Sequence, residues 1–378
     1  MKSFCYMLLC IVFLSAASCK EKYDLPQTVA NKDYLVVEGF IDGGNDSTFI
    51  TLSRTVTPGD TTQIKMEQGA IVSVEGESGE NFGLNEIAAG QYATAPLPLN
   101  PQGKYRLAIT TRNGKAYQSD YVDVKKTPAI DSISWSREPN GVQLYVNTHD
   151  DENQTKYYNW EYDETWEYYS FYYSIWEYKN GTMDYRNNPN LLFRCWQSYK
   201  SSNIIIGSSA KLSKDIIYNQ PISFIPDDSW KLSSRYSIIV KQRALSKGAY
   251  EYLQNVKKNS EQLGSIFDPQ PSTSNGNIHC MSDAQETVLG YVYSSTLVEK
   301  RIFITASEVK DWKYHFWCEQ EISVKNDPDS LKIYFEGQLY IPTTEIRVGP
   351  FIESYKASTR FCVDCTVRGG SSEKPDFW

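Results

Sequence analysis

The chain has 378 residues, a formal net charge of −8 at pH 7 and 40% hydrophobic residues, which is enough for buried cores. The acidic balance excludes a nucleic-acid binder and a protein that adheres to anionic lipid by a basic face, because both contacts depend on clustered Lys and Arg. A chain of this length predicts two domains. It carries 28 Tyr and 9 Trp, amphipathic aromatic residues that favour strands and binding surfaces.

The N-terminus has the layout of a secretory signal. Lys2 is followed by an apolar run over residues 4–14 and by small residues that lead to Cys19. The run is shorter than the ~20 apolar residues of a membrane helix. We therefore predict a signal peptide over residues 1–18 and a lipoprotein whose Cys19 is acylated, for example with palmitate. The alternative is a plain signal peptide beside an incidental cysteine, since Ala16 stands where a leucine is usual.

After a lipid anchor and tether over residues 19–32, the chain predicts an immunoglobulin-like β-sandwich over residues 33–126. Apolar and polar residues alternate in short runs, which is the period of a strand with one buried face. Asn113 and Gly114 separate two of these runs and are a strong signal for a tight hairpin. Short strands joined by Gly and Pro turns are typical of this fold, although its usual disulfide is missing here. The runs lie at residues 34–41, 50–53, 72–74, 105–109 and 117–121.

Residues 127–378 are predicted to form a larger β-rich domain with one or two helices, so the fold class of the whole chain is mainly β. A turn at residues 139–141 joins the first two strands of this domain as a hairpin. Ser246 can cap a helix whose apolar residues recur at helical spacing, and Gly264 can end that helix. Further strands are expected at residues 288–293, 301–305, 331–335 and 338–341.

The segment of residues 157–178 is the most distinctive part of the chain, because twelve of its 22 residues are aromatic. Acidic residues interleave with the aromatic ones, so a strand here would carry rings on one face and carboxylates on the other. Exposed rings would form a recognition surface for sugars, peptides or proteins, whereas buried rings would pack a long hairpin onto the domain below. The candidate binding residues are Trp160, Trp166, Tyr168, Tyr169, Tyr172, Tyr173 and Trp176.

No catalytic residue, metal or cofactor is predicted. Glu161, Glu164 and Glu167 raise the question of glycoside hydrolysis, which needs two carboxylates across a sugar bond, but their spacing fits a solvated acidic face as well. Oxygen-rich runs at residues 150–153 and 326–329 lack the spacing of a calcium loop and predict polar turns. The chain has no G-x-S-x-G motif and only three histidines.

Five cysteines follow Cys19, and in an exported protein they are predicted to form disulfides. Their odd number leaves at least one unpaired, and the connectivity stays open. The C-x-x-C motif of residues 362–365 lacks the second pair that a zinc site needs, and its flanks predict a loop rather than the strand-to-helix turn of a thioredoxin-like site. The candidates are Cys195, Cys280, Cys362 and Cys365, and the fifth cysteine is Cys318.

Several segments, taken together, resemble one known family, the domain-of-unknown-function 4249 family of Bacteroidota lipoproteins. Members of that family are typically encoded beside TonB-dependent receptors of the outer membrane. The resemblance therefore implies an accessory lipoprotein of such a receptor, and it supplies no catalytic residue. The segments are YLVVEGFI at residues 34–41, WEYDETWE at 160–167, YSIIVKQ at 236–242, LGSIFDPQP at 263–271, GNIHC at 276–280, CVDCTVRGG at 362–370 and KPDFW at 374–378.

These features lead us to expect a lipid-anchored outer-membrane protein that lies on the cell surface rather than on the periplasmic face. Its expected role is a ligand-binding or partner-docking module associated with a TonB-dependent transporter, not an enzyme. The ligand, whether a small molecule, a glycan or a peptide, stays open. Two alternatives remain: an exported hydrolase acting on glycans or peptides, and a structural protein of envelope assembly. The hydrolase would need convergent carboxylates, or a nucleophile beside a base, in one pocket.

Overall fold

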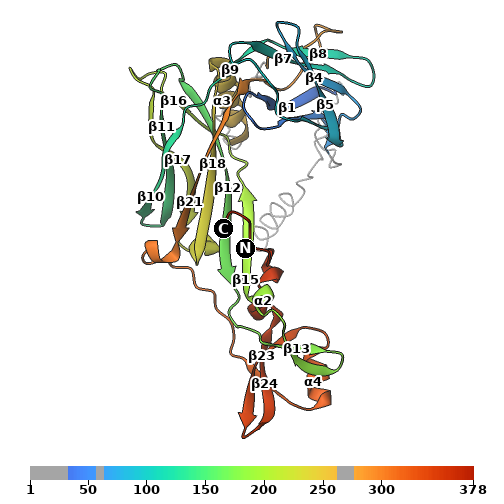
Figure 1. Ribbon diagram of the computed structural model, residues 1–378, viewed down its shortest axis with the longest axis vertical. Coiled ribbons are helices and arrows are strands. Elements are labelled where there is room, and N and C mark those ends of the chain that lie inside the picture. Colours follow the sequence, from blue (N-terminus) through green and yellow to red (C-terminus); the bar gives the residue numbers. More distant parts are fainter. Residues whose placement is uncertain (1–32, 57–63, 262–275) are drawn as a thin grey trace, which may run out of the picture.

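The computed structural model describes residues 33–56, 64–261 and 276–378, and the predicted signal peptide and Cys19 lie outside them. Figure 1 shows the strands gathered in three groups along the long axis of the molecule. The mainly β class predicted from the sequence is confirmed. Within the described ranges, no helix is both long and apolar enough to cross a membrane.

The first group is a closed barrel of eight strands that lies at one end of the molecule (Figure 1). Hydrogen bonds lead from β7 (Lys104–Thr110) through β4, β5, β6, β2, β1, β20 and β9 back to β7. Inward side chains such as Leu52, Leu107 and Tyr117 are fully buried and form the barrel core. The other strands of this group are β1 (Leu35–Asp42), β2 (Thr48–Arg54), β3 (Lys65–Met66), β4 (Ile71–Gly76), β5 (Asn81–Ala88), β6 (Gln91–Thr94), β8 (Ala116–Ser119), β9 (Val122–Lys125), β19 (Ile278–Cys280) and β20 (Ser294–Ser295).

The immunoglobulin-like arrangement predicted for residues 33–126 is not confirmed. An immunoglobulin domain keeps two separate sheets, whereas the pairing of β7 with β9 and the insertion of β20 between β1 and β9 close these strands into one ring. The local prediction of a hairpin at Asn113 and Gly114 is confirmed. These two residues connect β7 to β8, and Gly114 adopts a φ of +82° that suits the turn.

Two short strands of this group, β19 and β20, come from a much later part of the chain. The segment before β20 runs beside β1, where the N–H of Val37 donates to the carbonyl of Leu289 over 2.8 Å. Gly290 has a φ of +139°, and a Cβ there would lie 2.2 Å from the carbonyl oxygen of Val37, so this passage requires glycine. The continuous strand predicted at residues 288–293 is therefore wrong, because this stretch pairs only as an isolated bridge at Leu289.

The second group, the two-sheet unit, is built from two sheets that share one buried core. A three-stranded sheet faces a five-stranded sheet, and side chains such as Leu144, Trp160 and Val240 lie between them. The turn predicted at residues 139–141 joins the first two strands and is confirmed. The three-stranded sheet contains β10 (Ile130–Glu138), β11 (Gly141–His149) and β17 (Ile216–Pro226), and the five-stranded sheet contains β12 (Tyr157–Tyr169), β15 (Arg194–Lys200), β16 (Ile205–Ser208), β18 (Arg235–Ala244) and β21 (Leu297–Thr305).

Helix α3 (Lys247–Glu261) confirms the helix predicted from its apolar spacing. The N–H of Ala249 donates to Oγ of Ser246 over 3.2 Å, as expected of an N-cap. The helix lies against β12 and β16 and packs Tyr250 on Tyr157, with ring centroids 4.9 Å apart. Gly264, its predicted end, lies outside the described residues.

The third group, the distal unit, lies at the end opposite the barrel and has a small core around Trp176, Phe335 and Tyr355 (Figure 1). It combines a three-stranded sheet, a hairpin and one helix. Its elements are β13 (Trp176–Lys179), β14 (Thr182–Tyr185), β22 (Ile322–Lys325), α4 (Pro328–Phe335), β23 (Tyr340–Val348) and β24 (Phe351–Thr359), and the short helices α2 (Asn190–Phe193), η1 (Trp230–Leu232), η2 (Ala306–Glu308), α5 (Arg360–Val363) and η3 (Cys365–Arg368) complete the described chain.

The strand predicted at residues 331–335 is wrong, because these residues lie in α4. Asp327 caps the helix by accepting the N–H of Ser330 over 2.9 Å, and Pro328 occupies the first turn, where its missing N–H costs nothing. The oxygen-rich run in front of it is therefore the start of a helix. Of the side chains that follow, Leu331 and Phe335, four residues apart, point into the distal core at helical spacing.

Candidate binding surfaces

The aromatic segment of residues 157–178 divides into a buried part and a partly exposed part. Trp160, Trp166 and Tyr168 point into the core of the two-sheet unit, and Trp176 points into the distal core. All four are at most 6% exposed. Their prediction as a binding surface is therefore wrong. For the three residues of β12, the physical reason is that this strand is central, bonded to β15 and β16 on one side and to β18 on the other, with its ring-bearing face against the second sheet. Trp176 is buried because β13 packs on the distal core.

The exposed part of the segment, residues 169–173, lies where the chain leaves β12 for the distal unit, and we call this region the waist. Tyr169 and Tyr173 are partly exposed, and both pack on Phe193 with ring centroids 5.2 and 4.9 Å away. Tyr172 is half-buried, and its hydroxyl donates to the carbonyl of Glu319 over 2.9 Å. Of the seven predicted binding residues, these three tyrosines are the ones that reach the surface.

Glu164, the middle one of the three carboxylates considered for hydrolysis, is buried in the two-sheet core. It is paired with Lys231 and accepts a hydrogen bond from the hydroxyl of Tyr236 over 2.8 Å. Burial, reinforced by the charge of Glu164, raises the pKa of Tyr236, so that hydroxyl keeps its proton and remains a donor. The arrangement is an internal polar network whose carboxylate has no surface from which to reach a substrate.

Glu161 and Glu167 lie on the opposite face of β12 from Glu164, because side chains alternate along a strand. Oε2 of Glu161 is 3.1 Å from Nη1 of Arg243. Glu167 is paired with Arg194 and accepts a hydrogen bond from a serine hydroxyl. Each of the three carboxylates thus has its own cation, and the three do not converge as a glycosidase pair would.

Two disulfides fasten the waist. Cys195 at β15 bonds to Cys365 in η3, and Cys318 bonds to Cys362 in α5, with Cα atoms 5.8 and 6.0 Å apart. Disulfide formation is therefore confirmed for Cys195, Cys362 and Cys365, and the two halves of the C-x-x-C motif have different partners. The prediction for Cys280 is wrong, because this residue is a buried free thiol in the barrel. Cys318, and not Cys280, is the fourth cysteine in a disulfide.

Cys280 lies beside a network of charged side chains in the barrel. Glu286 accepts a hydrogen bond from the Tyr117 hydroxyl over 2.7 Å and lies 2.5 Å from Nζ of Lys115 and 3.8 Å from Nη1 of Arg54. Burial opposes the ionisation of Glu286, but these partners outweigh it and lower the pKa of the carboxyl. The network ties the segment before β20 to β2 and β8, so its function is structural.

Metal-binding side chains do not gather anywhere in the described part of the chain, where no group of three or more His, Cys, Asp and Glu could hold an ion. Residues 150–153 form the predicted polar turn, in which the Asp150 carboxylate accepts the N–H groups of Gln154 and Thr155 over 2.9 and 2.8 Å. His149 is exposed at the edge of the same turn, and its hydrogen bond with Asp131 raises its pKa.

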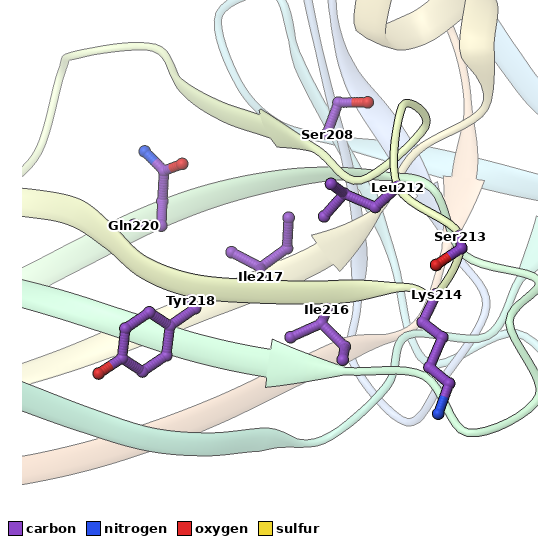
Figure 2. A pocket seen from close by; sticks show the side chains of 8 residues that line it. All are labelled: Ser208, Leu212, Ser213, Lys214, Ile216, Ile217, Tyr218 and Gln220. Atoms are coloured by element: carbon purple, nitrogen blue, oxygen red, sulfur yellow. The ribbon is translucent and has the colours of Figure 1, made fainter.

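An open groove lies between β16 and β17, two consecutive strands that belong to different sheets. β16 pairs with β12 and β17 pairs with β11, so their facing edges border an open space of about 590 Å³. Figure 2 shows Ile216 and Tyr218 on one side of β17 and Ile217 and Gln220 on the other. The lining residues are Ser208, Leu212, Ser213, Lys214, Ile216, Ile217, Tyr218 and Gln220.

The loop that closes this groove is held by a buried carboxylate. Asp215 accepts hydrogen bonds from the hydroxyls of Ser209 and Tyr158 and is almost fully buried. The groove was not predicted from the sequence, because it depends on two strands that join different sheets. One signal in the sequence does point to it. The alternation of residues 216–218 places Ile217 inward and leaves Ile216 and Tyr218 exposed on an edge strand.

The comparisons with known proteins agree with the resemblance noted in the sequence. The family model described as "Domain of unknown function (DUF4249)" matches residues 20–301, which is well over half of the chain. The match ends within β21 and does not include the C-x-x-C motif. The comparison with curated proteins finds no match. The chain therefore belongs to the family described as domain of unknown function DUF4249.

Proposed function

We propose that the protein is an exported lipoprotein, anchored to the outer membrane through Cys19, and that it serves as a ligand-binding or partner-docking module of a TonB-dependent transporter. The signal layout of residues 1–18 supports the export and the anchor. The two disulfides support a compartment outside the cytoplasm, where thiols are not kept reduced. The family membership and the family's usual genetic setting support the association with a transporter.

The observation that carries the binding role is the groove between β16 and β17. Leu212 and Tyr218 line it and are 55% and 79% exposed, although the same unit buries other aliphatic and aromatic side chains completely. Apolar side chains that are exposed around a concavity mark an interaction site more often than single apolar side chains scattered over a surface do. The partly exposed tyrosines of the waist supply a second surface of the same character.

The hydrolase alternative receives no support from the geometry of its best candidates. Glu164 is buried beside Lys231, and Glu161 and Glu167 point away from it with their own arginine partners. None of the three faces the groove, whose lining has serine, lysine and amide groups but no carboxylate. We therefore favour capture or docking over bond cleavage.

Recovery of the protein from its own membrane tests the proposal. The full chain, tagged at the C-terminus and expressed with its native signal, is purified from detergent-solubilised outer membranes of its host. A TonB-dependent transporter is expected to co-purify in a near-stoichiometric amount, and radiolabelled palmitate is expected to be incorporated.

The matched control for this experiment is Cys19→Ala, which removes the acceptor thiol and leaves the described fold unchanged. The variant should incorporate no palmitate and should lose most of the transporter, because a tether to the same membrane raises the effective concentration of the two proteins. Wild-type protein that brings down no transporter would contradict the docking role. Equal palmitate labelling of both proteins would contradict the anchor.

A further inference from the structure

The three-stranded sheet turns one face to the shared core and the other to solvent, and we call the solvent side the outer face. Val142, Leu144 and Val146 point into the core, so the residues between them on β11 point outward. Serines of β10 and aromatic residues of β17 extend the same face. Its central residues are Ser132, Ser134, Tyr145, Asn147, Tyr218 and Phe224.

Aromatic rings are spread across the outer face. Tyr218 and Phe224 on β17 are 79% and 46% exposed. The ring of Phe224 lies above Gly141, where a Cβ would stand 2.5 Å from its Cζ atom, so this glycine makes room for the ring. Tyr145 stands opposite Ser134 on the neighbouring strand. The rings offer flat apolar surfaces, and the tyrosines add hydroxyl tips.

Amide and hydroxyl groups between the rings are held in fixed positions. Nδ2 of Asn147 donates to Oγ of Ser132 over 3.0 Å, and Oδ1 of Asn147 accepts the N–H of Asn219 over 2.7 Å. Nε2 of Gln143 donates to the carbonyl of Ser223 over 3.1 Å. Because Ser132 is an acceptor here, its own O–H can donate to a ligand. These groups need no reordering before they bind, which favours affinity.

The charge pattern of the outer face selects a neutral ligand. Its charged side chains stand at its two ends: Glu138 accepts a hydrogen bond from Ser136, and His149 pairs with Asp131. Between these ends the face offers hydroxyls, amides and rings, so a phosphate, sulfate or carboxylate would meet no cation on the face itself, and Lys214 is the one cation among the described residues that line the adjoining groove.

An extended peptide is a poor occupant of the same place, because the free edge of β17 is unsuited to strand addition. Pro221 lies within β17 and cannot donate a ladder hydrogen bond. The register with β11 shifts on both sides of Gln220 and Pro221, and Asn219 has a φ of +50°. Bulges, proline and left-handed residues are devices that block edge pairing.

We infer that the outer face binds a neutral oligosaccharide, which continues into the groove at Tyr218. A sugar ring has an apolar C–H side that stacks on an aromatic ring and a rim of hydroxyls that bonds to amides and serines. Tyr218 belongs to both the face and the groove, so one glycan chain can contact both. This inference deepens the proposed function and rests on it, since an exported binding module is what would meet an extracellular glycan.

Affinity electrophoresis tests the inference with the purified chain of residues 20–378. The probes cast into native gels are the neutral polymers mannan, xylan, dextran and β-1,3-glucan, and the anionic polymer polygalacturonate. At least one neutral polymer should retard the wild-type protein. The double variant Tyr218→Ala/Phe224→Ala should weaken that binding at least about tenfold, the scale expected for the loss of two stacked rings.

Phe351→Ala is the matched control, because Phe351 is an exposed ring on the hairpin of the distal unit, away from the outer face. It should bind as the wild type does, and circular dichroism should show all variants folded. Three results would overturn the inference: no retardation by any neutral polymer, retardation by polygalacturonate alone, or equal binding by the double variant.

The transporter pull-down, repeated with the double variant, separates this inference from the proposed function. If the double variant keeps the transporter and the wild type shows no glycan binding, the inference fails and the proposed function stands. If the double variant loses the transporter and no glycan binds, the outer face is a protein contact and the inference is also overturned. Glycan binding by a wild type that recovers no transporter would sustain the inference and contradict the docking role.

Discussion

Glu164 carries a charge inside the two-sheet core, and Lys231 is the cation that balances it. Removal of one partner from a buried pair leaves an uncompensated charge, which costs far more than the pair itself contributes. Lys231→Met should therefore lower the free energy of unfolding by about 3 kcal/mol, measured by urea denaturation. The double variant Glu164→Gln/Lys231→Met should recover most of the loss, because no buried charge remains.

Lys241→Met is the control for this prediction. Lys241 pairs with Asp163 on the more exposed face of the same sheet, over 2.8 Å, and an ion pair that water reaches contributes at most about 1 kcal/mol. If Lys231→Met proves no more harmful than Lys241→Met, Glu164 is not stabilised by its lysine in the way described.

Glu286 makes the free energy of unfolding depend on pH in the acid range. Its pKa in the folded chain lies below the usual 4.5. Its ionised form therefore stabilises the fold fully above that usual value, and the contribution is lost as the pH falls through the folded pKa. The difference in unfolding free energy between the wild type and Glu286→Gln should be constant near neutral pH and should shrink below pH 4.5. A difference that grows on acidification would contradict this prediction.

At the scale of elements, the disulfides define how the waist is held. Cys195 and Cys365 are 170 residues apart in sequence, and Cys318 and Cys362 are 44 apart. Peptide mapping of the unreduced chain of residues 20–378 should find these two links. Iodoacetamide should label Cys280 alone after denaturation, and Cys280→Ser should take up no label. A link between Cys362 and Cys365 would contradict this connectivity.

Strand β12 shows what a local pattern can and cannot predict. The alternation of rings and acids in residues 157–169 predicted a strand, and the structure has one there. Whether the rings were core or surface depended on the second sheet, formed by β10, β11 and β17, which the segment itself does not encode. Tyr169 and Trp166 illustrate the outcome, since they differ by three positions and end on opposite faces.

The strand predicted where helix α4 lies was wrong for a different reason. A short apolar run such as residues 331–335 fits the period of a strand and of a helix equally well. The deciding signal stood just before it, since Asp327 followed by Pro328 is a typical cap and first turn. The cap at Ser246 correctly predicted α3, because the apolar residues behind it span several helical turns.

At the scale of the whole molecule, the strands of the barrel could be predicted but its closure could not. β1, β2, β4, β7 and β8 follow from alternation and from the hairpin turn at Asn113 and Gly114. The strand that completes the ring, β20, is two residues long and carries no periodic pattern. The groove and the outer face were hidden for a related reason, because each depends on how distant strands are shared between sheets.

The two residues of β20 also impose an order on the assembly of the chain. A polypeptide is synthesised from its N-terminus, so β1 to β9 are made well before Ser294 and Ser295. Until then the edges of β1 and β9 that β20 later joins are unpaired, and such edges bind other strands readily. The barrel is therefore among the last parts of the protein to be completed, because most strands of the two-sheet unit must be synthesised before the barrel can close.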